Sequence, residues 1–371
     1  MHASAERYGS DTACARIAEA ATDNGWDVAA LLPYEGPLCG ELRGLGVAVT
    51  VLDPIVLRRA DLRGWRAGLL PLRWSRSAKS LHSFLRNGPS YDVVHTNCAP
   101  TVGGLLIARW SRAKHVWYVH EIFPEGIQRR VFDQLLRRSA DIVLACSRAA
   151  LDQFPGVVAA GIGRVAHTGI EIAHVPTTEP MVRPAPVVVC VGRLNAWKGQ
   201  EVLVDAMGIL LGRGVDLRAE LVGSYFRDQS QYEDRLRAQV QRLGLVGHVE
   251  FLGERTDALE IVARADISVT PSTQPEPFGT ALVEAMALGR PVVASAGGGP
   301  TEIINDGEDG LLVPPGDVVA LADALQRLIE APEFARALGA QARVRAADFS
   351  SRSMTKVVLA SYEELLRRGP E

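Results

Sequence analysis

The chain has 371 residues, 47% of them hydrophobic, which is long enough for two domains with full cores. Its 40 Lys and Arg residues against 43 Asp and Glu residues give a net charge of -3, which excludes the overall basic charge typical of nucleic-acid-binding proteins. Five cysteines without a Cys-x-x-Cys pair, no apolar run of about 18 residues and no signal-peptide core at the start indicate a cytoplasmic protein, soluble or peripheral to a membrane, with reduced thiols.

Short apolar segments alternate with helical or loop stretches along the whole chain, which predicts an α/β protein with parallel, doubly wound sheets. The expected strands of the first half are 28–32, 47–52, 92–96, 115–120, 141–146 and 162–166. Those of the second half are 187–191, 217–222, 249–252, 267–270, 292–295 and 311–313. The triplet Ala-Asp-Ile opens a late strand in each half, at 140–142 and 265–267, which favours two similar domains.

Proline-rich residues 171–186 contain four prolines, too many for a helix and typical of a semi-rigid connector. We therefore expect an N-terminal domain over 1–170, a linker over 171–186 and a C-terminal domain over 187–350. Ser350 or Ser351 can cap a final helix that runs to about residue 368.

A basic stretch over 57–86 carries eight Lys or Arg residues against one acidic residue, with leucines and tryptophans interleaved. Such a segment can lie on anionic lipid at the inner face of a membrane. A helix packed on its own domain with solvated arginines explains the pattern equally well. Pro71 is expected to break the helix in either case.

His120 ends the strand 115–120 at the carboxyl edge of the expected sheet, where ligands bind in open α/β folds. It is a candidate for chemistry on a substrate, with Glu121 placed to orient its ring. A structural histidine is the alternative.

Residues 161–166 fit the dinucleotide-binding pattern G-x-G-x-x-A. The strand that should precede this pattern and the helix that should follow it are missing, so we interpret these residues as a turn into the last strand of the domain.

Arg193 and Lys198 lie in the loop after the strand 187–191. A guanidinium fork and an ammonium at one sheet edge suit a leaving diphosphate. A pair of surface cations is the alternative.

The segment 271–290 is the most informative part of the chain. From Gly279 it predicts a helix of about three turns in which Thr280 and Glu284 are the polar residues before Arg290, so the helix should be buried on every side. Glu284 should then lie near the open end, with hydroxyls or amides to receive it. The helix start suits a phosphate, and two carboxylates, Glu276 and Glu284, suit a polyol attached to that phosphate, as in a sugar nucleotide. A glutamate on a solvated face with a chance spacing is the alternative.

Glu276 and Glu284, with Phe278-Gly279 between them, resemble the Glu-x7-Glu motif of retaining nucleotide-sugar glycosyltransferases with two Rossmann-like domains facing across a cleft. This is the GT-B fold of glycosyltransferase family 4, the group that contains the sucrose and glycogen synthases. Arg193 and Lys198, which follow Gly192, match the family's paired cations. The resemblance extends over nearly the whole chain.

The resemblance implies a role for each candidate residue. Arg193 and Lys198 would neutralise the departing phosphate, His120 would lie near the reacting sugar, Glu276 would contact the sugar hydroxyls and Glu284 the ribose. Gly9 in the loop 8–11 would approach the diphosphate and the acceptor, and the glycine loop 297–302 would lie near the donor. The donor-binding set is Gly9, Arg193, Lys198, Glu276, Phe278, Gly279, Thr280 and Glu284, and the final helix would cross back onto the first domain.

We therefore expect retaining transfer of a hexosyl-type sugar from a UDP-sugar or GDP-sugar to a hydroxyl acceptor, which could be a sugar or a lipid-linked sugar of a cell-envelope glycan. No metal cofactor is expected, because the chain holds no Asp-x-Asp motif and no ligand cluster. A sugar-nucleotide epimerase of similar build and a non-catalytic sugar-nucleotide-binding protein are the alternatives. A dehydrogenase is disfavoured by the weak dinucleotide pattern.

The N-terminus departs from the family. Residues 1–8 contain no apolar run, and the loop-like 9–11 follows at once before the helical pattern 13–21. In a doubly wound sheet the first strand is central and paired on both sides. We therefore expect a gap between neighbouring strands of the N-terminal domain, and a natural start about ten residues or more upstream with a Val/Ile/Leu-rich strand.

Overall fold

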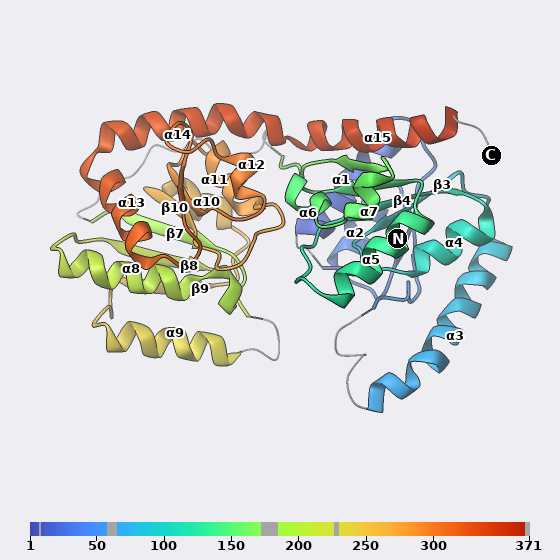
Figure 1. Ribbon diagram of the computed structural model, residues 1–371, viewed down its shortest axis with the longest axis horizontal. Helices are drawn as coiled ribbons and strands as arrows, with labels where there is room; N and C mark the ends of the chain where they lie inside the picture. Colours follow the sequence, from blue (N-terminus) through green and yellow to red (C-terminus); the bar gives the residue numbers. More distant parts are fainter. Residues whose placement is uncertain (7–8, 58–64, 172–184, 226–229, 368–371) are drawn as a thin grey trace. The chain divides into compact units, whose positions relative to one another are not determined.

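The fold is an α/β fold with parallel sheets, as the sequence predicts, and the computed structural model describes residues 1–6, 9–57, 65–171, 185–225 and 230–367 (Figure 1). Two units are separated by their internal contacts: unit 1 is Met1–Gly169 with Ser351–Glu371, and unit 2 is Ile170–Ser350. Tyr8, linker residues 172–184 and three of the basic residues (58, 59 and 63) lie outside the described part, as do the side chains of 65–71.

Unit 2 has a parallel sheet with the strand order β12-β11-β10-β7-β8-β9. Its strands are β7 (Val187–Val191), β8 (Arg218–Val222), β9 (Val249–Gly253), β10 (Ile267–Thr270), β11 (Val292–Ser295) and β12 (Leu311–Val313). Its helices are η3 (Ala196–Lys198), α8 (Gln200–Gly212), α9 (Ser230–Arg242), α10 (Ala258–Arg264), α11 (Thr280–Ala287), α12 (Pro300–Ile303), α13 (Val318–Glu330), α14 (Pro332–Ala346) and η4 (Ala347–Phe349).

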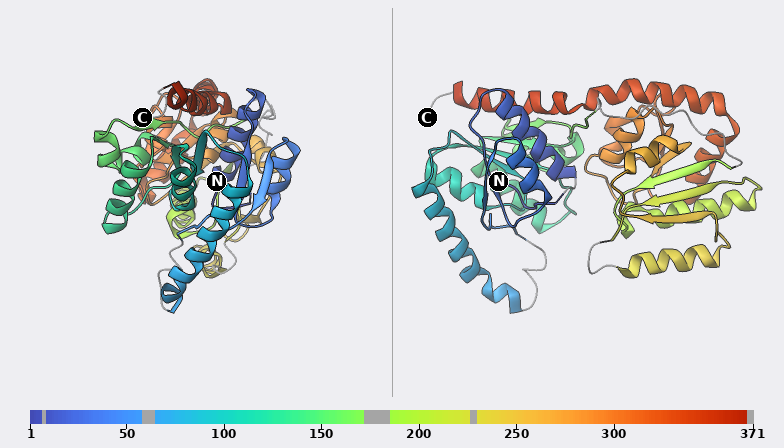
Figure 2. Two further views of the ribbon diagram at one scale, coloured as in Figure 1. Left: turned by 90° about the vertical axis from the view of Figure 1, so that its right-hand side faces the viewer. Right: turned by 180° about the vertical axis from the view of Figure 1, so that it is seen from behind.

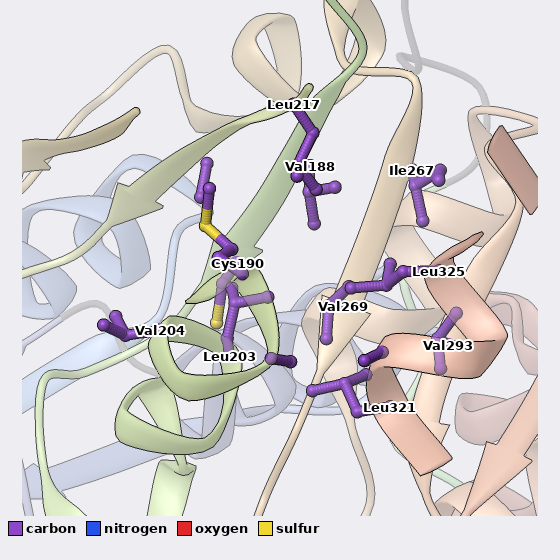
Figure 3. Close-up of a cluster of buried hydrophobic side chains, with 14 of the residues drawn as sticks. Val188, Cys190, Leu203, Val204, Leu217, Ile267, Val269, Val293, Leu321 and Leu325 are labelled. Atoms are coloured by element: carbon purple, nitrogen blue, oxygen red, sulfur yellow. The ribbon is translucent and has the colours of Figure 1, made fainter. Parts of the chain in front are cut away.

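The core of unit 2 explains why its central strand β7 reads as a continuous apolar run. Val188 and Cys190 point into one cluster with Leu203 of α8 and Leu325 of α13 (Figure 3). Side chains alternate across a strand, so Val189 points to the opposite face, and it too is fully buried. A strand that is buried on both faces does not alternate between polar and apolar residues.

Unit 1 has two parallel sheets, β1-β2 and β3-β4-β5-β6. Their strands are β1 (Ala29–Leu32), β2 (Ala48–Val51), β3 (Val93–Asn97), β4 (Lys114–Val119), β5 (Ile142–Ala145) and β6 (Gly163–Val165). The helices of this unit are α1 (Gly9–Asp23), α2 (Pro37–Gly44), α3 (Trp65–Asn87), α4 (Gly103–Ser111), α5 (Ile127–Ser139), α6 (Arg148–Asp152), α7 (Pro155–Ala159) and α15 (Ser351–Arg367). As expected, residues 161–166 turn into the last strand of this unit.

The gap expected between strands of unit 1 lies between β1 and β3, and Met1 and His2 fill one end of it. The amide of His2 donates to the Leu31 carbonyl (3.2 Å), and the Met1 carbonyl accepts from the amide of Asn97 (2.8 Å). A cavity of about 60 Å³ lies beside them, lined mostly by apolar residues of β1, β3 and the helices above them. The upstream strand stays a prediction.

The final helix α15 packs on unit 1, beside α1 (Figure 2). The Tyr362 hydroxyl is hydrogen bonded to Nδ1 of His95 in β3 (2.7 Å), and the Tyr362 ring meets the ring of Trp26 edge to face. Residues at the two ends of the sequence thus share one core.

The aspartate of each Ala-Asp-Ile triplet accepts a hydrogen bond from the backbone of a neighbouring strand. Asp141 accepts a hydrogen bond from the backbone amide of His115 (2.6 Å), and Asp266 accepts one from the amide of Val187 (2.7 Å). In both units the carboxylate therefore satisfies a backbone amide at the start of the neighbouring strand, the second amide of β4 and the first of β7.

Helix boundaries differ from the sequence prediction in three places. Residues 9–11 form the first turn of α1 and not a loop, since Asp11 provides the negative charge that a helix start favours. Helix α3 continues through Pro71, which lies in its second turn.

Helix α11 is the third correction, because it has 8 residues and so about two turns, not three. It ends at Ala287, with Leu288 as its C-cap, because Gly289 takes a left-handed conformation (φ 68°). The amide of Arg290 donates to the Ala285 carbonyl (3.0 Å) and that of Gly289 to the Met286 carbonyl (2.8 Å). This paired arrangement satisfies the last carbonyls and stops the helix. The helix is buried along most of its length, as predicted.

Within the described ranges, no helix is both long enough and apolar enough to cross a lipid bilayer.

Candidate functional site

The loop after β7 turns sharply so that its cations stay at the carboxyl edge of the sheet. Asn195 caps the short helix η3 by accepting a hydrogen bond from the Lys198 amide (3.0 Å). Gly199 follows in a left-handed conformation (φ 73°), and a Cβ there would clash with the carbonyl oxygen of Pro271. The loop of Lys198 and the loop before α11 therefore pack backbone to backbone, which fixes the position of Lys198 relative to Glu276.

Lys198 and Glu276 form a two-pronged ion pair at this edge. The Lys198 ammonium donates to both carboxylate oxygens of Glu276 (2.8 and 2.9 Å), and the Ser272 hydroxyl donates to one of them (2.9 Å). Glu276 is only 6% exposed. A carboxylate buried to this extent requires such partners, and Ser272 is one that the sequence analysis did not name.

The glycine loop 297–299 lies directly against the loop of Glu276. The Glu276 amide donates to the Gly297 carbonyl (3.1 Å), and the Gly299 amide donates to the Glu276 carbonyl (2.8 Å). Side chains at Gly298 and Gly299 would collide with the backbone of Glu276 and Phe278. The expectation that this loop lies near the donor site remains a proposal, but its glycines have a structural reason.

Glu284 lies one turn into α11, and its carboxyl group is largely buried. Burial raises the pKa of Glu284 to about 7. Contrary to the sequence prediction, no hydroxyl or amide of the described residues donates to its carboxylate. Burial therefore favours the protonated, uncharged form of this carboxyl group more than in an exposed glutamate.

Arg193 is half-buried in the same loop as Lys198, and its carbonyl accepts a hydrogen bond from the Gln200 side chain (3.0 Å). Phe278 is buried and meets the ring of Phe349 edge to face. Gly279 precedes α11 with φ 118°, and Thr280 is its first residue. Unit 2 thus brings together seven of the predicted residues: Arg193, Lys198, Glu276, Phe278, Gly279, Thr280 and Glu284.

The other two predicted residues, Gly9 and His120, lie in unit 1. Gly9 is the first residue of α1, and His120 follows β4 directly. The ring of His120 packs on Tyr118, with ring centroids 4.0 Å apart. Burial, together with the neighbouring His2, lowers the pKa of His120 to about 3, so its imidazole is neutral at physiological pH.

Glu121 does not orient the His120 ring. Its carboxylate accepts hydrogen bonds from the backbone amides of His120 (3.1 Å) and Ala99 (3.2 Å). The ring is held by Asn97, whose Oδ1 lies 2.8 Å from His120 Nε2. Asn97 is the last residue of the neighbouring strand β3, so its position at the same sheet edge was a signal that could have identified it.

A metal-ligand cluster of three or more His, Cys, Asp or Glu side chains does not occur among the residues that the structure describes. Chemistry without a metal ion remains a proposal.

The structure consists of two units with parallel α/β folds, as expected for the GT-B fold. Comparison with known proteins supports this assignment. Residues 179–345 match the family described as glycosyl transferases group 1, and residues 9–165 match a glycosyl transferase 4-like domain. The chain belongs to the GT-B glycosyltransferases of family 4.

The chain is also similar to individual glycosyltransferases. The chain is 30% identical over 315 residues to a D-inositol 3-phosphate glycosyltransferase of Actinosynnema mirum, covering 77% of this chain and 76% of that protein. It is 38% identical over 177 residues to a phosphatidyl-myo-inositol mannosyltransferase of Mycobacterium leprae, covering 46% and 44%. The crystal structure of Anabaena HepE in complex with UDP-glucose is similar at a TM-score of 0.81 and 27% identity, covering 98% of both chains. This protein is therefore a glycosyltransferase that uses a nucleotide-sugar donor.

Proposed function

We propose that this enzyme transfers a hexosyl group, with retention of anomeric configuration, from a nucleoside diphosphate sugar to a hydroxyl acceptor. The observation that carries the proposal is the ion pair of Lys198 with Glu276 at the sheet edge of unit 2, with Glu284 one turn into the helix that follows; a cation and two carboxylates match a diphosphate and its two sugars. The similarity to HepE, whose structure was solved with UDP-glucose, favours UDP as the nucleotide to test first.

In this proposal Lys198 and Arg193 stabilise the charge that develops on the leaving phosphate. Lys198 is already fixed by its ion pair with Glu276, so it costs little further ordering when the donor binds. Groups of this kind contribute roughly 3 to 4 kcal/mol each to transition-state stabilisation. Hydrogen bonds from Lys198 and Ser272 lower the nucleophilicity of the Glu276 carboxylate. In the proposed reaction the bond between the anomeric carbon and the phosphate oxygen breaks while the acceptor oxygen bonds to that carbon on the same face of the sugar, and the leaving phosphate oxygen accepts the proton of the acceptor hydroxyl.

The two glutamates divide the donor between them. Glu284 receives the ribose hydroxyls, which replace the hydrogen bonds that its carboxylate lacks, and Glu276 receives hydroxyls of the transferred sugar. Glu284→Ala should therefore weaken binding of the free nucleoside diphosphate, whereas Glu276→Ala should spare this affinity and lower turnover. Calorimetric titration with UDP and GDP measures the first effect. Equal losses of nucleotide affinity in both variants would contradict the assignment.

The acceptor is proposed to be a sugar or a lipid-linked sugar, reached at the inner face of a membrane through α3. In the described part of this helix, four basic residues are exposed: Arg73, Arg76, Lys79 and Arg86. The same helix also packs on its own unit, since Leu81 is fully buried and the Ser77 hydroxyl donates to Asp53 (2.9 Å). Figure 1 shows its N-terminal end projecting away from the rest of unit 1. A peripheral contact would involve that end.

Product analysis tests the proposal. The protein is incubated with UDP-glucose or GDP-mannose and a panel of sugar and lipid-linked sugar acceptors, and the product is examined by NMR for the configuration of the new linkage. A retained anomeric centre on a glycosylated acceptor supports the proposal. An isomerised donor sugar would favour an epimerase, an inverted linkage would refute retention, and tight nucleotide binding without turnover across the panel would favour a non-catalytic binder.

A further inference from the structure

The N-terminal residues of unit 1 form a buried polar chain that ends at His120. The His120 ring contacts Asn97, and the Asn97 amide nitrogen lies 2.9 Å from Nδ1 of His2 and 2.9 Å from the carbonyl oxygen of Ser10. Nε2 of His2 is in turn hydrogen bonded to the carboxylate of Asp11. His2, Asp11 and Asn97 are each at most 1% exposed, although all three are polar.

Donor and acceptor roles in this chain follow from one group that can only accept. The Ser10 carbonyl requires a donor, so the NH₂ group of Asn97 points to it and to His2, and Oδ1 of Asn97 points to His120. Nε2 of His120 must then carry a proton in order to donate to Oδ1. Nδ1 of His2 must be an unprotonated acceptor, which leaves its proton on Nε2, donated to Asp11.

The other side of the His120 ring is consequently fixed as an acceptor. Its Nδ1 has no proton in the neutral form, and it makes no hydrogen bond to a residue that the structure describes. His120 itself is only half-buried. The ring therefore presents a lone pair, and not an N–H, to a molecule that arrives at the end of β4.

We infer that Asn97, held by His2 and Asp11, is a positioning residue that fixes His120 as a neutral imidazole whose Nδ1 accepts a hydrogen bond from a hydroxyl of the bound sugar. The inference deepens the proposed function and rests on it, since it names how His120 recognises its substrate. Sugar hydroxyls supply the required donors. A carbonyl or phosphate oxygen, which can only accept, would be rejected at this position.

The groups around His120 agree with a neutral ring. The neighbouring titratable groups are His2 of the N-terminal segment and His95 of β3, and the Asp11 carboxylate is bound to His2. The Glu121 carboxylate is engaged by two backbone amides, and burial raises its pKa. Burial also raises the pKa of the Cys98 thiol beside His2, so this thiol adds no negative charge near neutral pH.

The wild-type protein provides the direct test. Long-range ¹H–¹⁵N correlation spectra of its histidine rings, with His120 assigned from the missing signals of His120→Gln, report which nitrogen carries the proton. We expect the Nε2–H form of His120 from pH 5 to pH 8. A proton on Nδ1 of His120, or an imidazolium within this range, would overturn the inference. The measurement needs no turnover, so it remains decisive even if the proposed reaction is not observed.

Variants of Asn97 test the consequence for catalysis. Asn97→Ala should lower kcat by about 10- to 100-fold with nucleotide affinity little changed, because most of the proposed nucleotide contacts lie in unit 2; circular dichroism checks that the variant is folded. Asn97→Asp places a carboxylate beside Nε2–H and should stabilise the imidazolium, so activity should be lost as the pH falls between 8 and 5. The same two changes at the exposed Asn24 serve as controls. An unaltered kcat and pH profile in a folded Asn97 variant would refute the positioning role.

Discussion

Glu284→Gln offers a prediction whose size follows from the structure. The pKa of the carboxyl group is raised from an ordinary 4.5 to about 7 by burial, a difference worth at most roughly 3 kcal/mol in unfolding free energy. Between these two pH values the folded protein holds a proton that the unfolded chain has released. The free energy of unfolding should therefore decrease as the pH rises from about 4.5 to about 7, and then level off. Glutamine has no charge to bury, so the variant should not show this decrease.

Urea unfolding followed by circular dichroism at pH 5, 6, 7 and 8 measures the difference. Glu284→Gln should match the wild type at pH 5 and exceed it by about 1 to 3 kcal/mol at pH 8. Glu308→Gln, at an exposed loop position of the same unit, is the matched control and should follow the wild type throughout. A constant offset between Glu284→Gln and the wild type at all four pH values would refute the reasoning.

Nucleotide binding completes the same prediction. Ribose hydroxyls are expected to bind the ionised form of Glu284, so affinity for the nucleoside diphosphate should rise as the pH increases through about 7. Glu284→Gln should lose this dependence and bind about 10- to 100-fold more weakly at pH 8, since a hydrogen bond to a charged group is worth about 1.5 to 3 kcal/mol. Calorimetry at two pH values checks both statements, and an unchanged affinity would exclude Glu284 from the ribose site.

Three further predictions concern the leaving phosphate, metals and membranes. Lys198→Ala should slow transfer by roughly a hundredfold or more, and a loss below threefold in a steady-state assay would remove Lys198 from phosphate stabilisation. EDTA should leave initial rates largely unchanged, because charge on the phosphate is met by side chains; strict dependence on added Mn²⁺ or Mg²⁺ would contradict this. Sedimentation with anionic vesicles should fall, most clearly at low salt, when Arg58, Arg59, Arg63 and Arg66 are changed together to Ser. No vesicle binding by the wild type would exclude a membrane-binding face.

Four strands of unit 2 were predictable because they are largely buried on both faces. Segments 187–191, 267–270, 292–295 and 311–313 have the predicted limits, since each is a short apolar run bounded by turn residues. Helix ends were less predictable. Gly289 reads as a small residue in an apolar helix, and only its backbone conformation shows that it ends α11. Pro71 did not break α3, because a proline in the second turn costs one hydrogen bond that the rest of a long helix can offset.

The candidate site was predictable where its residues share one segment of sequence. Glu276 and Glu284 flank a single helix start, and Lys198 follows a recognisable strand. Asn97 and Ser272 were missed because their role depends on contacts between residues far apart in the chain: Asn97 bonds His120, 23 positions away, and His2, 95 positions away. Periodicity reports which face of an element is buried, but not which polar partners meet at a sheet edge.

The two ends of unit 2 lie side by side, since the Ile170 amide donates to the Phe349 carbonyl (3.0 Å), so this unit is inserted into the sequence of unit 1. During synthesis unit 2 is a continuous segment that can fold as it leaves the ribosome, whereas unit 1 must wait for α15. His95 and Tyr362 are 267 residues apart. At about 5–20 residues per second, the first unit stays incomplete for roughly 15 to 50 s. Throughout that interval the surface of α1 that α15 later covers is exposed to chaperones and proteases.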